Sequence, residues 1–123
     1  MEQKIIRGKR ILLVDDEVPV RQAFRMLLEI DDHQVTEAGN GAEALELLAK
    51  SSVDLVVTDF EMPVMNGNQM AVKIKQLAPK QPILMITAYG RDLGDPGNPV
   101  DAILNKPVTL KDLRQAIAKL LPG

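Results

Sequence analysis

The sequence predicts an α/β protein built on a doubly wound, five-stranded parallel sheet. Short apolar runs alternate along the chain with longer segments in which apolar residues recur every three or four positions, the spacing of one helix face. Strands separated by helices of this length imply crossover connections and a sheet covered on both faces. Because parallel strands all end at the same edge, we expect the residues that follow them to share one crevice.

Four apolar runs are predicted strands, and acidic, hydroxyl or amine side chains follow them. The runs and their following residues are 11–14 with Asp15 and Asp16, 53–58 with Asp59, 82–86 with Thr87, and 101–105 with Lys106 and Pro107. A fifth strand is predicted over 33–37, where polar and apolar residues alternate. It begins with the single histidine, His33, which we expect to be half-exposed.

Four helices are predicted between and after these strands. The first spans 18–30, the second begins at an Asn40 cap, the third begins at Asn66-Gly67 and is stopped by Pro79, and the last follows a Thr109 cap. Segment 90–99 contains three glycines and two prolines, so a regular helix is not expected there. The fourth helix of the alternating order is therefore expected to be shortened or irregular.

Length and composition indicate one domain over 1–123, with its core at about 9–121. A net charge of −2, from 15 basic and 17 acidic residues, gives no electrostatic footprint for direct nucleic-acid binding. The absence of cysteine suits the cytoplasm and excludes thiolate metal sites. No stretch is long and apolar enough for membrane insertion.

The acidic residues after the first and third strands predict a metal site. Asp15, Asp16 and Asp59 would lie close together, and two unit charges ~4 Å apart repel by about 4 kcal/mol at an effective dielectric of 20. Such a cluster requires a cation. Carboxylate oxygens without cysteine or a second histidine select a hard ion, and Mg²⁺ fits best because it also binds phosphate oxygens.

The motifs together resemble the receiver domain of response regulators in two-component signalling. They are Val14-Asp15-Asp16-Glu17, Asp59-Phe60-Glu61-Met62-Pro63, Asn66-Gly67, Thr87-Ala88 and Lys106-Pro107, and the resemblance extends from Lys9 to Leu121. It implies the flavodoxin-like strand order 2-1-3-4-5. By the same resemblance Asp59 is the phosphoacceptor, Asp16 binds Mg²⁺ directly and Asp15 partly through water. Asp59 and the backbone carbonyl of Glu61 complete the ion site.

The expected function is Mg²⁺-dependent phosphoryl transfer onto Asp59, ionised at neutral pH, from a sensor histidine kinase, a phosphotransfer protein or a small phosphodonor. Lys106 and the Thr87 hydroxyl would meet the charge of the phosphoryl group, and Lys106-Pro107 is a candidate cis peptide. We expect self-phosphorylation and slow hydrolysis, with no turnover of a substrate. The signal would pass to a downstream protein partner or to an effector domain that this sequence does not contain.

Departures from the family pattern concern the output step. Ile103 occupies the place of the usual switch aromatic, three residues before Lys106, and Tyr89 is either a substitute or a ring that covers the pocket rim. Three alternative functions are compatible with parts of the sequence: a haloacid dehalogenase-type phosphatase using Asp59 and Glu61, a flavodoxin-like FMN carrier, and a phosphorylation-independent scaffold. The third-strand position of Asp59 and the repulsion of a phosphate by Asp15-Asp16-Glu17 disfavour the first two.

Overall fold

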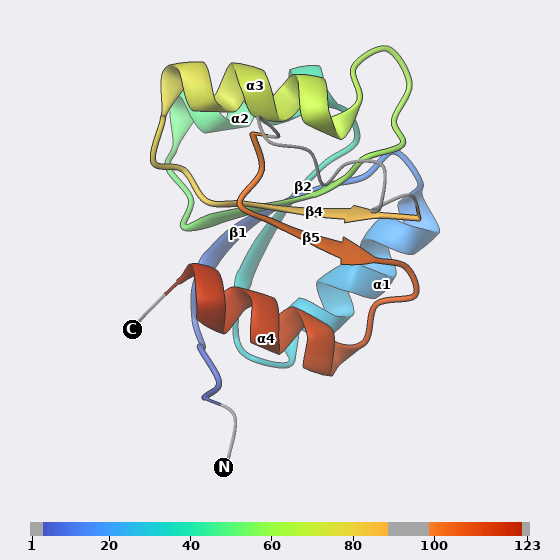
Figure 1. Ribbon diagram of the computed structural model, residues 1–123, viewed down its shortest axis with the longest axis vertical. Helices are drawn as coiled ribbons and strands as arrows, with labels where there is room; N and C mark the ends of the chain where they lie inside the picture. The colour runs from blue at the N-terminus through green and yellow to red at the C-terminus, as the bar shows by residue number, and fades with distance from the viewer. Residues whose placement is uncertain (1–3, 89–98, 122–123) are drawn as a thin grey trace.

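The computed structural model describes residues 4–88 and 99–121, and its sheet confirms the predicted fold class (Figure 1). The elements in chain order are β1 (Arg10–Val14), α1 (Val18–Glu29), β2 (Gln34–Ala38), α2 (Gly41–Lys50), β3 (Leu55–Asp59), α3 (Gly67–Leu77), β4 (Ile83–Thr87), β5 (Ala102–Asn105) and α4 (Leu110–Leu120). The five strands pair in parallel in the order β2-β1-β3-β4-β5.

Helices cover both faces of the sheet, with α2 and α3 on one side and α1 and α4 on the other (Figure 1). Alternate strand residues therefore enter two separate cores. Leu13 and Val57 belong to the core under α1 and α4, whereas Leu12 and Val56 belong to the core under α2 and α3. The central strand β3 is buried at all five positions, as a strand covered on both faces must be.

The predicted caps define where the helices begin. Asn40 accepts a hydrogen bond from the Glu43 N–H at the start of α2. Asn66 and Thr109 form reciprocal capping boxes with Gln69 and Asp112, and these satisfy N–H groups that would otherwise lack partners. The third helix ends at Leu77, two residues before Pro79, because the residue preceding a proline disfavours helical geometry.

Two expectations about burial are wrong. The spacing of Met70, Ile74 and Leu77 predicts that all three face inward, but Leu77, the last residue of α3, is 74% exposed. His33 is 4% exposed rather than half-exposed, and it precedes β2 instead of beginning it. Its Nδ1 accepts a hydrogen bond from the Lys9 N–H at 3.0 Å, which ties the N-terminal segment to this turn. Burial lowers the pKa of His33, so the neutral ring is the folded form.

The predicted irregular helix over 90–99 lies outside the described residues except for Pro99. Within 4–88 and 99–121, none of the helices combines the length and apolar character needed to cross a bilayer.

Candidate functional site

Three backbone hydrogen bonds align the strand ends that carry the predicted site. Asp15 N donates to Ala38 O at 3.1 Å. Phe60 N donates to Ile86 O at 3.0 Å, and Lys106 N donates to Thr87 O at 2.9 Å. Pairing thus continues to the last residue of each strand and brings the side chains of β1, β3, β4 and β5 to one edge of the sheet.

Asp59 is one of two buried acids that the structure describes at this edge, with Asp15. It is the last residue of β3 and 4% exposed, and its Oδ1 lies 2.9 Å from Nζ of Lys106. The Lys106 side chain is 31% exposed and follows β5 directly, before a cis peptide bond to Pro107. Burial alone would lower the pKa of Lys106, but its contact with Asp59 outweighs that effect and raises it. The lysine is therefore a cation at neutral pH.

Asp15, Asp16 and Glu17 form the acidic cluster at the end of β1. One carboxylate oxygen from each lies within 4.8 Å of the others. Burial raises the pKa of Asp15, and the negative charges of Asp16 and Glu17 act in the same direction. Glu17 N donates to Asp15 Oδ1 at 2.9 Å, which fixes one carboxylate in place. This set of oxygen ligands, with two exposed members and one buried, fits Mg²⁺.

The structure thus groups the acids somewhat differently from the expectation. Glu17 joins Asp15 and Asp16 among the described residues, whereas Oδ1 of Asp59 faces Lys106. Asp59 still lies close to the cluster, since the charge of Asp15 contributes to raising the pKa of Asp59. Glu17 follows the two aspartates directly in the sequence, so the acidic run was the signal that could have identified it.

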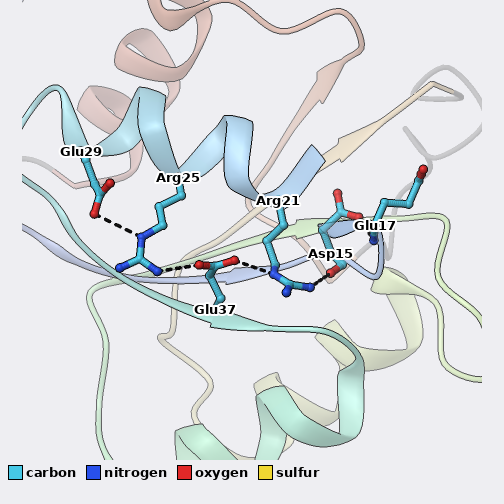
Figure 2. Close-up of polar contacts among 6 residues, drawn as sticks. All are labelled: Asp15, Glu17, Arg21, Arg25, Glu29 and Glu37. Atoms are coloured by element: carbon cyan, nitrogen blue, oxygen red, sulfur yellow. Dashed lines mark hydrogen bonds and ion pairs between the residues drawn. The ribbon is translucent and has the colours of Figure 1, made fainter. Parts of the chain in front are cut away.

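A chain of ion pairs ends in a hydrogen bond to the Asp15 backbone carbonyl (Figure 2). Arg21 Nη1 donates to the carbonyl oxygen of Asp15 at 2.7 Å, and Arg21 Nε donates to Glu37 at 2.6 Å. Glu37, on β2, lies between Arg21 and Arg25, and Arg25 also pairs with Glu29 (Figure 2). The sequence does not reveal this support, because it depends on the register of β2 against α1.

Glu61 contacts the other side of the crevice through its side chain. The Thr87 hydroxyl donates to Glu61 Oε1 at 2.9 Å, and the Ala88 N–H donates to the same oxygen at 3.3 Å. Glu61 Oε2 is buried and accepts no hydrogen bond from the described residues. Burial would raise the pKa of Glu61, but the hydrogen bond from Thr87 and the contact with Asp59 lower it. For the receiver function, the sequence predicted a role only for the Glu61 backbone carbonyl.

The ionisation of Asp59 differs from the expectation. Burial raises the pKa of Asp59 to about 7; Lys106 opposes this shift, while the contact with Glu61 adds to it. Two carboxylates in contact must share a proton or be neutralised by a cation. Without a bound cation Asp59 is therefore partly protonated at neutral pH, whereas the sequence led us to expect a fully ionised carboxylate.

The Asn66-Gly67 pair keeps the backbone close behind Asp59. Gly67 N donates to Phe60 O at 3.0 Å, and a Cβ at Gly67 would lie 2.5 Å from the carbonyl oxygen of Asp59. Only glycine fits this approach without displacing the end of β3.

Of the two residues that the sequence connects with signal output, Ile103 and Tyr89, the structure describes only Ile103. Ile103 is half-buried on β5 and lines an open groove between this strand and α4. Tyr89 lies outside the described residues.

The comparisons define the class of protein. The family model for the response regulator receiver domain matches residues 11–118. The chain therefore belongs to the response regulator receiver domain family of two-component signalling. This membership sets aside the phosphatase and FMN-carrier alternatives.

Individual relatives differ in how much of their length this chain covers. The response regulator receiver protein CpdR of Brucella abortus is 36% identical over 116 residues, which are 92% of this chain and 97% of CpdR. The autoinducer 1 sensor kinase/phosphatase LuxN of Vibrio harveyi is 34% identical over 113 residues, which are 90% of this chain but only 13% of LuxN.

Solved structures agree with this placement. TrrA of Thermotoga maritima, in complex with Mg²⁺ and BeF, is 32% identical, with a TM-score of 0.86 over 92% of this chain and 99% of that one. TrrA in complex with the histidine kinase ThkA is 31% identical, with a TM-score of 0.83 over 92% of this chain and 98% of that one.

Proposed function

We propose that residues 1–123 form one receiver domain in which Asp59 accepts a phosphoryl group from a phosphohistidine, in a Mg²⁺-dependent reaction that switches partner binding. The observation that carries the proposal is the position of Asp59. It is buried at the carboxyl edge of the sheet, with Lys106 at 2.9 Å and the Asp15 cluster beside it.

The proposed step uses the groups of the crevice in distinct roles. A carboxylate oxygen of Asp59 forms a bond to phosphorus as the bond from phosphorus to the donor imidazole nitrogen breaks, and the electron pair stays on that nitrogen. The transition state spreads negative charge over the equatorial oxygens, so positioned cations and hydrogen-bond donors supply most of the catalysis. Lys106 would meet this charge from one side, and the Thr87 hydroxyl would donate to a phosphoryl oxygen.

Asp15, Asp16 and Asp59, with the backbone carbonyl of Glu61, would hold Mg²⁺, and the carboxylate of Glu17 is available to the same ion. The bound cation supplies charge neutralisation, which also favours the carboxylate form of Asp59 at neutral pH.

An apolar groove next to the crevice supports a protein donor. It is formed by residues of α1, which begins directly after Glu17, and by Val108, two residues after Lys106. Its lining residues are Pro19, Val20, Ala23, Phe24, Leu27 and Val108. TrrA has been crystallised with a histidine kinase, and by similarity we propose a sensor histidine kinase or phosphotransfer protein as the donor for this chain.

Acetyl phosphate with Mg²⁺ tests the proposal, with intact-mass spectrometry as the measurement. Attack of Asp59 on this donor breaks the bond from phosphorus to the acetyl oxygen and releases acetate. We expect one added phosphoryl group per chain, absent in EDTA and absent in Asp59→Asn. Asp54→Asn is the matched control on the opposite edge of the sheet and should label normally. Persistent labelling of Asp59→Asn would reject the acceptor, and no labelling of the wild type would favour the scaffold alternative.

A further inference from the structure

We propose that the Glu61 carboxylate stands in for the phosphoryl group in the unmodified chain, and that its displacement limits the rate at which Asp59 is phosphorylated. The inference rests on the proposed function, because it concerns access to the same acceptor. It adds a role for a side chain that the acceptor chemistry itself does not use.

The contacts of Glu61 are those that a phosphoryl oxygen on Asp59 would need. Oε1 accepts from the Thr87 hydroxyl at 2.9 Å and from the Ala88 N–H at 3.3 Å. Each donor has one hydrogen to give, and Thr87 is fully buried. A phosphoryl oxygen and Glu61 Oε1 therefore compete for the same two donors. The side chain must leave before or while the phosphoryl group arrives.

Only one carboxylate oxygen of Glu61, Oε1, is held by hydrogen bonds among the described residues, so the side chain can leave the crevice at low cost. Oε2 of Glu61 is buried without a hydrogen-bond donor among the described residues, and the carboxylate contacts that of Asp59. A phosphoryl group on Asp59 would bring further negative charge against Glu61. Repulsion and competition thus both expel Glu61 from the crevice once the phosphoryl group is in place.

Expulsion of Glu61 also supplies a conformational difference that a partner protein can recognise. A ligand shifts a protein between two states only through contacts that differ between them. Here the carboxylate would exchange an enclosed position beside Thr87 for a solvent-facing one on a loop whose residues Pro63 and Val64 are exposed. The charge of the surface beside the crevice would change upon phosphorylation.

Three substitutions of Glu61 separate occupancy of the crevice from simple charge repulsion of the donor. Glu61→Asp keeps the charge but is one methylene too short to hold Thr87 and Ala88. Glu61→Gln loses the charge but keeps an oxygen at the same reach. Glu61→Ala removes both. Glu46→Ala, on the exposed face of α2, removes the same charge away from the crevice and is the matched control.

The measurement is the initial rate of labelling by acetyl phosphate at saturating Mg²⁺, followed by intact mass. We expect Glu61→Asp and Glu61→Ala to label at least about fivefold faster than the wild type, because neither side chain can occupy the two donors. Glu61→Gln and Glu46→Ala should stay within about twofold of the wild-type rate. A slower Glu61→Ala, or a fast Glu61→Gln with an unchanged Glu61→Asp, would overturn the proposal. Failure of the proposed function would be distinct, because then no variant would acquire a phosphoryl group.

A second measurement needs no phosphoryl transfer. Hydrogen exchange of the Ala88 amide, followed by NMR without Mg²⁺ or phosphodonor, reports whether Glu61 covers it. We expect faster exchange in Glu61→Asp and Glu61→Ala than in the wild type, with the amides of central β3 unchanged as a control for folding. Equal protection of Ala88 in all variants would overturn the stand-in role.

Discussion

Asp31 and Asp59 are almost equally buried, at 3% and 4% exposed, yet their surroundings act in opposite directions. Arg114 donates two hydrogen bonds to Asp31, at 2.9 and 2.8 Å, and these hold the pKa of Asp31 below its usual value. Asp59 has one lysine and two acids as neighbours, and burial raises its pKa to about 7. Burial alone therefore does not decide ionisation. The Arg114 guanidinium neutralises Asp31, so Asp31 stabilises the fold. The neighbouring acids leave the charge of Asp59 only partly neutralised, so Asp59 can gain from binding a cation and is suited to accept a phosphoryl group.

The largest stability effect is expected from breaking the satisfied pair. Asp31→Asn replaces two charge-assisted hydrogen bonds with a neutral acceptor, so we expect the free energy of unfolding to fall by about 2 kcal/mol. Urea unfolding at pH 7 measures this change. Asp32→Asn is the matched control. The Asp32 side chain is 75% exposed, and its one ion pair among the described residues is a long one, 3.7 Å from Arg7. Equal losses in the two variants would show that burial at Asp31 is not what matters.

Asp59→Asn should do the opposite and stabilise the chain in EDTA. The pKa of Asp59 is raised from an ordinary 3.8 to about 7 in the folded state, so the folded chain holds a proton that the unfolded chain releases between these values. Wild-type stability therefore falls as pH rises through this window, while that of Asp59→Asn does not. At pH 8 we expect a gain on the order of 1–2 kcal/mol.

Denaturant unfolding of both proteins at pH 5 and pH 8 tests the sign. The stability gained by Asp59→Asn over the wild type should be larger at pH 8 than at pH 5. With Mg²⁺ present this difference should shrink, because the ion relieves the same repulsion in the wild type. A gain that is larger at pH 5 would contradict the raised pKa.

The smallest effect is expected at Asp15, whose charge is the last of the contributions that raise the pKa of Asp59. Asp15→Asn removes one of the repelling charges, so the melting temperature should rise in EDTA, by less than in Asp59→Asn, while Mg²⁺ binding weakens. Differential scanning calorimetry and isothermal titration with Mg²⁺ measure the two changes. Asp16→Asn should weaken Mg²⁺ binding with little change in melting temperature, because Asp16 is exposed. A lower melting temperature for Asp15→Asn in EDTA would argue against repulsion in the cluster.

The sequence predicts most of the fold because the spacing of apolar residues and the helix caps are local properties of the chain. Asn40 and Thr109 mark helix starts through their own backbone contacts, and the apolar runs indicate strands without knowledge of their neighbours. Leu77 and His33 were misplaced because their burial depends on where the sheet ends and which segment covers a turn. Those are tertiary facts that spacing does not contain.

The site shows the same division. Residues at strand ends were predictable, because parallel strands bring Asp15, Asp59, Thr87 and Lys106 to one edge. The side-chain partners were not predictable. Arg21 reaches Glu37 only because α1 packs against β2, and Glu61 reaches Thr87 from the loop after β3 to the end of the neighbouring strand β4. The raised pKa of Asp59 follows from desolvation, which a sequence cannot supply.

Titration of the two buried aspartates in one sample tests most directly whether the crevice keeps Asp59 poised. The carboxyl carbons of Asp31 and Asp59 can be followed by ¹³C NMR from pH 3 to pH 9 in EDTA and again with Mg²⁺. Asp59 should titrate near 7 without the ion and far lower with it, while the pKa of Asp31 stays below its ordinary value in both. Titration of both carboxyls below pH 4 in EDTA, with no response of Asp59 to Mg²⁺, would contradict the central claim.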